Sequence, residues 1–376
     1  MLLASLLLGG CVPDFGVFTV VDDADAGGAA DAGAVDGGGT DGGGLDGGGL
    51  DGGAVDAGST DGGPPGDGGT PTCAVRPLPC LDASDPDVIE LPTEAGAEAF
   101  DTATPGQTIQ VRGASLTGLS WIPTGVTLRG CEGARITGAV AFEGGLGFVE
   151  GFAVSGQIVA NRGGTFTIRD NVFSGSTGRE GVVEARAIDA LVSANVRATV
   201  ERNHFADVGD GVVARTRYDT MVHAVELTVR NNVFERVPRP IVLDEAGLVG
   251  AISAHIAHNT FVDFATAIRI VDVSMGTVEL PANLFARGDT AVAGDSAWEG
   301  AANLYWLVTQ PHVVPPLAGG LSEIDEPFED TEGGDLRLVA GSPAVDGVAV
   351  GDVADDFFGC PRPAGPRADV GAIETR

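Results

Sequence analysis

An asparagine followed two residues later by an aromatic residue recurs six times in this chain. An aliphatic residue precedes the asparagine by three positions in five copies, and another follows it by nine positions in four consecutive copies. Each copy therefore predicts two short strands joined by a tight bend. The six pairs are Asn171/Phe173, Asn203/Phe205, Asn232/Phe234, Asn259/Phe261, Asn283/Phe285 and Asn303/Tyr305.

Repeats of this length favour a solenoid, in which each coil of chain lies on the previous one and equivalent residues stack about 4.8 Å apart. An inward-facing asparagine at the bend can hydrogen-bond backbone amides in neighbouring coils and tolerate left-handed dihedral angles. We therefore expect an asparagine ladder with a stack of aromatic rings beside it. Stacked helical repeats fit less well, because the apolar runs are short, β-branched and interrupted by glycine.

The interval between successive asparagines shortens from 32 to 20 residues along the chain. In four copies the interval from the asparagine to the aliphatic residue of the second strand stays constant, so the variation lies in one connection per coil. We expect these connections to form loops on one side of the solenoid that become shorter toward the C-terminus.

The repeats and the segments before them resemble the right-handed parallel β-helix proteins typified by pectin and pectate lyases. Residues 103–113 look like the opening segment of that family, and residues 125–130 and 151–156 look like its first coils. The resemblance covers about residues 88–335. It implies an all-β fold, a right-handed parallel β-helix, and it implies little about function.

The C-terminal end has a second resemblance. The patterns SPAxD at 342–346, DxxGxxRP at 356–363 and DxGAxE at 369–374 are similar to the C-terminal segment of bacterial surface β-helix proteins grouped as choice-of-anchor Q domains. We expect this segment to cap the last coil, which would otherwise expose backbone and apolar side chains. Asp346, Asp356 and Asp369 are interpreted as turn and cap carboxylates rather than catalytic groups.

The first ten residues resemble the signal peptide of a bacterial lipoprotein. They form an apolar run too short to span a membrane, and residues 8–11 (LGGC) resemble a lipobox in which Cys11 receives the lipid. No basic residue precedes the run, which departs from the usual pattern. The resemblance implies export and lipid anchoring at the outer membrane or cell surface, with the membrane as a partner through Cys11.

Aspartates with a period of five follow, separated mostly by glycine and alanine, from Asp31 to Asp61. Such a sequence has almost nothing apolar to bury, so residues 11–71 are expected to be a disordered tether. A calcium-binding repeat array is the alternative, but its period differs and no apolar position recurs here. The β-helix is expected at 72–335 and the cap at 336–376.

Four cysteines remain after lipidation of Cys11, and an exported chain favours disulfides between them. Cys73 with Cys80 is the local pair. Cys131 with Cys360 would be the second pair if the solenoid lets an early coil reach the C-terminal segment.

The charge of the chain excludes some partners. All 21 basic residues are arginines, and residues 72–376 contain 41 acidic residues. So acidic a body is a poor partner for nucleic acid or an anionic surface. No CxxC or HxxxH spacing indicates zinc. We expect no metal or other cofactor; calcium is not excluded, although no motif indicates it.

The catalytic motifs of the resembling enzymes do not occur in this sequence. Pectate and pectin lyases use calcium-binding carboxylates with an arginine base, polygalacturonases a triplet of aspartates, and alginate epimerases an Asp-Pro-His-Glu run. The sequence therefore leans against an enzyme without deciding the question. His255 and His258 flank Ile256 and are interpreted as an incidental exposed pair rather than as a base.

A ligand-binding surface is expected in the loop between Val212 and Asn232 and on the strands that stack beneath it. Mixed arginine, aspartate and tyrosine side chains on a solenoid flank suit a sugar chain, through bidentate and stacking contacts. A solvated face with structural ion pairs is the alternative. The candidate residues are Arg215, Arg217, Tyr218, Asp219, His223, Asp244 and Arg269.

Three functions remain open at this point. The leading hypothesis is a bacterial surface lipoprotein whose β-helix binds extracellular or envelope polysaccharide. The second is a polysaccharide lyase or glycoside hydrolase, and the third is a passive adhesive or envelope-structural protein.

Overall fold

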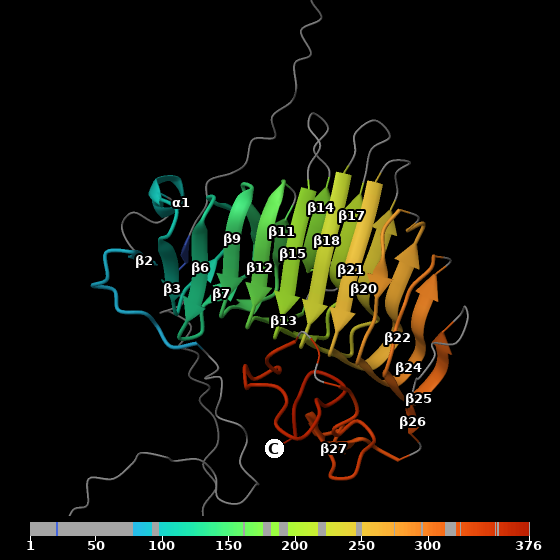
Figure 1. Cartoon of the computed structure of the whole chain (residues 1–376). Coiled ribbons are helices and arrows are strands. Elements are labelled where there is room, and N and C mark those ends of the chain that lie inside the picture. Colours follow the sequence, from blue (N-terminus) through green and yellow to red (C-terminus); the bar gives the residue numbers. More distant parts are fainter. Residues whose placement is uncertain are drawn as a thin grey trace, which may run out of the picture. The chain divides into compact units, whose positions relative to one another are not determined.

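The computed structural model is a parallel β-helix, as the repeat predicts (Figure 1). Most of the expected tether, Cys11 and Cys73 lie outside the residues that it describes. The described residues are 20–21, 78–91, 98–160, 162–175, 182–187, 195–216, 223–245, 250–273, 275–294, 296–312, 321–323, 325–349, 351 and 353–375.

The six coils between Thr108 and Glu245 contain three strands each, one more than the repeat suggested. The first strands of nine successive coils form a nine-stranded parallel sheet, which we call the first face. Its strands are β2 (Val88–Leu91), β3 (Thr108–Arg112), β6 (Val126–Cys131), β9 (Gly145–Glu150), β12 (Gly164–Arg169), β15 (Asn195–Glu201), β18 (His223–Arg230), β21 (Gly250–Ala257) and β23 (Val278–Glu279).

The second face consists of short strands that follow the bend after the first face. They are β4 (Ser115–Leu116), β7 (Arg135–Ile136), β10 (Ala153–Val154), β13 (Val172–Ser174), β16 (His204–Ala206) and β19 (Val233–Glu235). The third face consists of longer strands. They are β5 (Leu119–Ile122), β8 (Ala139–Phe142), β11 (Gln157–Ala160), β14 (Val183–Ala187), β17 (Asp210–Thr216) and β20 (Arg239–Glu245).

The second and third faces join into one sheet near the C-terminal end of the solenoid. There single strands span both faces, and β26 (Leu321–Glu323) pairs with the last of them. The spanning strands are β22 (Thr260–Val271), β24 (Leu284–Gly294) and β25 (Leu304–His312).

A second bend, two residues after each aromatic residue, explains the third strand. The residue there has a positive φ in successive coils, for example 75° at Gly175, 55° at Asp207 and 53° at Arg236. The aromatic residue therefore lies between two bends, in a short strand of its own. The sequence pattern shows only the constant spacing from the asparagine to the next aliphatic position, and this interval contains both bends. The pattern therefore suggested a single bend.

Equivalent positions of the repeat stack in register. On the first face, Ile168, Val200, Val229 and Ile256 are partners in succession. On the third face, Val212, Ile241, Ile268 and Val292 are partners in succession. All eight are at most 1% exposed, so the two aliphatic positions of the repeat form opposite walls of one continuous core.

The aromatic residues form the expected stack inside this core. Ring centroids of consecutive members are 4.5–5.3 Å apart, with interplanar angles of 4–10°. The members are Phe173, Phe205, Phe234, Phe261, Phe285 and Tyr305. Coil spacing places the rings at the separation that stacked aromatic pairs favour.

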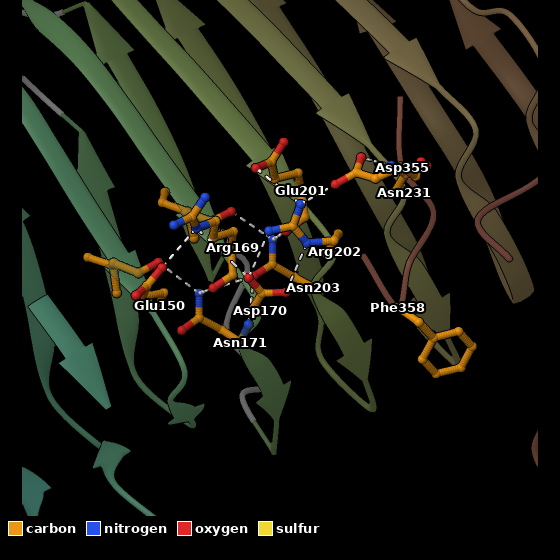
Figure 2. A network of polar contacts seen from close by, with 12 residues as sticks. Glu150, Arg169, Asp170, Asn171, Glu201, Arg202, Asn203, Asn231, Asp355 and Phe358 are labelled. Carbon is orange, nitrogen blue, oxygen red and sulfur yellow. Dashed lines mark hydrogen bonds and ion pairs between the residues drawn. The ribbon is translucent and has the colours of Figure 1, made fainter. Parts of the chain in front are cut away.

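The asparagine ladder is also present. Each ladder asparagine is fully buried. From Asn203 onward, its Oδ1 accepts the backbone N–H of the asparagine one coil earlier at 2.8–3.0 Å and that residue's Nδ2 at 3.0–3.3 Å. Figure 2 shows two neighbouring members, Asn171 and Asn203. The left-handed residue is the one before each asparagine, not the asparagine itself as we expected.

The N-terminal end of the solenoid is covered by several short segments. The helix α1 (Glu98–Thr102) buries Ala99 and Phe100, and β1 (Val20–Val21) pairs antiparallel with β4. Residues 78–81 lie across the first coils, where Leu81 exchanges hydrogen bonds with the side chain of Gln110 and the carbonyl of Pro79 accepts from Arg129.

The expected disulfide pairing is wrong. Cys80 is bonded to Cys131, with 5.3 Å between their Cα atoms, so neither the Cys73–Cys80 pair nor the Cys131–Cys360 pair forms. The reason is the course of residues 78–81, which cross the end of β6 and bring Cys80 to Cys131. Cys360 is disulfide-bonded as well, and Cys73 lies outside the described residues.

The C-terminal segment covers a lateral face of the solenoid rather than only its last coil. After the hairpin of β27 (Phe328–Asp330) and β28 (Asp335–Leu338), the chain runs beneath the second face, as the red trace in Figure 1 shows. Apolar side chains of residues 336–373 pack on outward-facing residues of β19, β22, β24 and β25. The segment reaches back to Arg202, whose Nη1 lies 2.5 Å from Oδ2 of Asp355.

Candidate functional site

The third face carries three candidate residues, Arg215, Asp244 and Arg269. Arg215 on β17 and Asp244 on β20 are register partners in consecutive coils. The Arg215 guanidinium lies between two carboxylates: its Nη1 is 3.3 Å from Oε1 of Glu184, and its Nε is 3.6 Å from Oδ2 of Asp244. Three consecutive coils thus contribute one acid, one base and one acid to the same surface.

Burial differs among these three side chains. Glu184 is fully buried, whereas the side chains of Arg215 and Asp244 are 23% and 32% exposed. Glu184 also accepts a hydrogen bond from Nε2 of Gln157 at 3.2 Å. Arg215 is therefore a strand residue held over a buried carboxylate, not the freely solvated loop arginine that the sequence suggested.

One nitrogen of the Arg215 guanidinium makes no hydrogen bond. Its Nε is buried and has no hydrogen-bond partner, because the 3.6 Å separation from Asp244 exceeds hydrogen-bond length. The exposed part of this guanidinium, which a carboxylate fixes on one side, can bind hydroxyl or carboxylate oxygens of a ligand. Sequence reasoning missed Glu184 and Gln157, because nothing in their local sequence marks them as neighbours of Arg215.

The remaining candidate residues divide into two groups. Arg269 on β22 is exposed and pairs in register with Val242, so it lies on the same face as Arg215 but in a neighbouring row. His223 begins β18, and its side chain lies outside the described residues. Arg217, Tyr218 and Asp219 also lie outside them. The structure thus brings together Arg215 and Asp244, with Arg269 nearby.

Elsewhere the charged residues form ladders of alternating sign. At the end of the first-face strands, register partners alternate between arginine and glutamate. Glu150 is ion-paired with both Arg129 and Arg169, and Glu201 with Arg230 (Figure 2 shows Glu150, Arg169 and Glu201). Parallel coils place equivalent residues in contact, so side chains of the same charge at these positions would repel each other. Alternation of arginine and glutamate gives attraction between neighbouring coils instead. These residues fit the structural alternative.

The two histidines predicted to form an exposed pair have different surroundings. Nδ1 of His255 lies 3.0 Å from Oε2 of Glu279. His258 is 4% exposed, with a φ of 52°, beneath the C-terminal segment. Its Nδ1 donates to the carbonyl of Asp369 at 3.1 Å. Burial and the nearby Arg362 lower the pKa of His258 to about 3, so the ring is neutral near neutral pH.

The C-terminal motif residues have structural contacts, in agreement with their interpretation as turn and cap groups. Asp356 accepts the backbone N–H groups of Phe358 and Cys360, and Asp369 accepts those of Asp346 and Thr375. Burial raises the pKa of Asp356 although these donors oppose the shift.

Gly371 of the DxGAxE pattern is required by space as well as by dihedral angle. Its φ is 94°, and a Cβ there would lie 2.8 Å from Oγ1 of Thr260 and 3.1 Å from Cβ of Leu284. Its N–H donates to the carbonyl of Ala282. The glycine therefore lies at a point of close approach between the segment and the solenoid.

Neither a metal-binding cluster nor a membrane-spanning helix occurs in the described part of the chain. In that part, no three side chains of histidine, cysteine, aspartate or glutamate gather as a metal site would require. Over the same residues, no helix has the length and apolar character needed to cross a bilayer.

Comparison with known proteins adds no identification. No protein-family model matches the chain, and no curated protein matches it.

Proposed function

We propose that this protein is an exported, lipid-anchored surface protein whose β-helix binds an extracellular or envelope polysaccharide. The observation that carries the proposal is the arrangement of Arg215 on the third face. Its guanidinium is held between Glu184 and Asp244, and its side chain is still 23% exposed. Such a group, presented on a rigid sheet, suits recognition of the oxygen-rich surface of a sugar chain.

The finer resemblances support the same proposal. The asparagine ladder and the parallel coils are the features through which the chain resembles pectin-lyase-like β-helices, and the C-terminal patterns resemble choice-of-anchor Q segments of bacterial surface proteins. The lipobox-like residues before Cys11 support anchoring through a lipid. Together they favour a protein displayed at the cell surface, where polysaccharides are abundant.

A passive structural role is the second candidate, and the charge ladders favour it. Ion pairs between consecutive coils account for many charged residues of the first face, and Arg215 itself contacts Glu184. On this hypothesis the third face is one more ladder and binds nothing. Glycan retention distinguishes the two candidates.

The test uses the full chain with Cys11→Ser on a glycan array. This variant should leave the membrane fraction, because Cys11 carries the lipid anchor that the sequence predicts. Arg215→Lys keeps a positive charge beside Glu184 but loses the planar fork of donors. We expect retention on the bound glycan to fall about 10- to 100-fold, since hydrogen bonds to charged groups contribute about 1.5–3 kcal/mol each.

Arg197→Lys is the matched control, because Arg197 lies on the first face in an exposed pair with Glu226. It should leave retention unchanged, and neither variant should lower the melting temperature. Equal retention by Arg215→Lys and the parent would contradict the proposed surface, and no retention of any glycan would favour the structural role. Unsaturated uronate products or new reducing ends would instead identify a lyase or hydrolase.

A further inference from the structure

His258 lies at the junction between the solenoid and the C-terminal segment. The residue occupies the left-handed position before ladder residue Asn259 and is 4% exposed. Its Nδ1 must be protonated, because the carbonyl of Asp369 can only accept. A neutral imidazole thus donates one of the hydrogen bonds that join the segment to the solenoid.

The same carbonyl also accepts from a positive charge. Nη1 of Arg362 donates to the Asp369 carbonyl at 3.0 Å, so His258 and Arg362 share one acceptor. A second proton on His258 would place an imidazolium beside a guanidinium in a site with little access to water. The two positive charges would contact the same carbonyl oxygen away from solvent, and their repulsion strongly disfavours the protonated ring.

The carboxylates near His258 are already engaged. Glu374 accepts from Nη1 of Arg362 and from the backbone N–H groups of Ala364 and Asp369. The Asp369 carboxylate accepts backbone N–H groups of its own segment, as does that of Asp356. On the solenoid side, the positive charge of His255 also acts to lower the pKa of His258, and Arg202 is paired with Asp170 and Asp355.

We propose that His258 is a pH-sensitive latch, which holds the C-terminal segment on the β-helix near neutral pH and loosens it on acidification. The docked segment buries the neutral ring against Arg362, whereas an undocked segment leaves the ring in water, free to take up a proton. Acidification therefore favours the undocked state.

The direction of the effect follows from linkage. The docked state lowers the pKa of His258 from 6.5 to about 3. Docking is therefore unaffected above pH 6.5 and weakens as the pH falls below it, about tenfold for each pH unit. Undocking would uncover the apolar residues of the second face that the segment now buries, including Val233, Leu284 and Leu304.

Hydrogen exchange on the full chain, at about pH 7 and about pH 5, tests the latch. After correction for the intrinsic pH dependence of exchange, we expect protection of the Gly371 and Ala372 amides, which donate to Ala282 and Thr260 of the solenoid, to fall roughly 30-fold. Protection of the Thr127 amide in the first coils should stay constant, which separates undocking from global unfolding.

His258→Asn should abolish this pH dependence. Asparagine keeps a donor near the Nδ1 position and tolerates a positive φ, but it does not titrate. His204→Asn is the matched control, because His204 is a partly exposed histidine on β16, two coils before the coil of His258, and this variant should behave as the parent does.

Two results would overturn the latch: the same acid-induced loss of protection in His258→Asn, or no loss in the parent. If His258→Asn fails to fold, an NMR titration of the His258 ring in the parent decides. A pKa near 6.5 in the folded protein would contradict the proposal.

Discussion

At the scale of single residues, one asparagine per coil organises the bend. The side chain of Asn232 donates to the carbonyls of Val200 and Arg230 and to Oδ1 of Asn259. In all six copies of the repeat, the residue before the ladder asparagine has a left-handed conformation. That residue is an aspartate, arginine, asparagine, histidine or alanine. Such variety explains why no sequence signal located it.

Replacing Asn232 by alanine should lower the free energy of unfolding by about 1–3 kcal/mol, the cost of leaving buried backbone groups without partners. Asn195→Ala is the control, because Asn195 is exposed at the start of β15, and it should change the free energy by less than about 0.5 kcal/mol. Chemical denaturation measures both. Similar effects of the two substitutions would argue against a stabilising ladder.

At the scale of the strands, stacking in register determines which charges can coexist. The first-face ladder through Glu150 and Glu201 is largely buried, whereas the ladder at the second bend, through Asp207 and Arg236, is exposed. Both alternate in sign. The energetic value of an ion pair depends on burial, so the two ladders should differ in their contribution to stability.

Glu201→Ala should cost about 1–3 kcal/mol, because it leaves Arg230 without its buried acceptor. Asp207→Ala removes an exposed partner of Arg236 and should cost less than about 1 kcal/mol. Thermal or denaturant unfolding of both variants gives the comparison. A larger cost for Asp207→Ala would show that burial does not decide the value of these pairs.

At the scale of the whole molecule, the C-terminal segment ties several coils together. The residue immediately after each ladder asparagine faces outward, and its exposed fraction shows which coils the C-terminal segment covers. Val172 is 41% exposed in an uncovered coil, whereas Val233, Leu284 and Leu304 are at most 3% exposed under the segment. Arg362 joins the two parts, donating to Glu374 within the segment and to Asn231 on the solenoid.

Arg362→Met should cost about 3–5 kcal/mol, because it leaves the fully buried Glu374 carboxylate without its cation. Adding Glu374→Gln should recover part of this loss by removing the uncompensated charge. The control is Arg337→Met, since Arg337 pairs with Asp335 in a partly exposed hairpin. Urea titrations of the parent, Arg362→Met, Glu374→Gln, the double variant and the control would measure the coupling, and purely additive effects would contradict it.

The sequence by itself determined the coil, because Asn, aromatic and aliphatic positions recur at spacings that only stacked strands satisfy. It also indicated the structural role of Asp356 and Asp369. Only the tertiary structure decided the partner of Cys80, the burial of His258, the contact of Arg215 with Glu184 and the lateral docking of the C-terminal segment. Each depends on which surfaces meet across distant parts of the chain, and local periodicity contains no information about that.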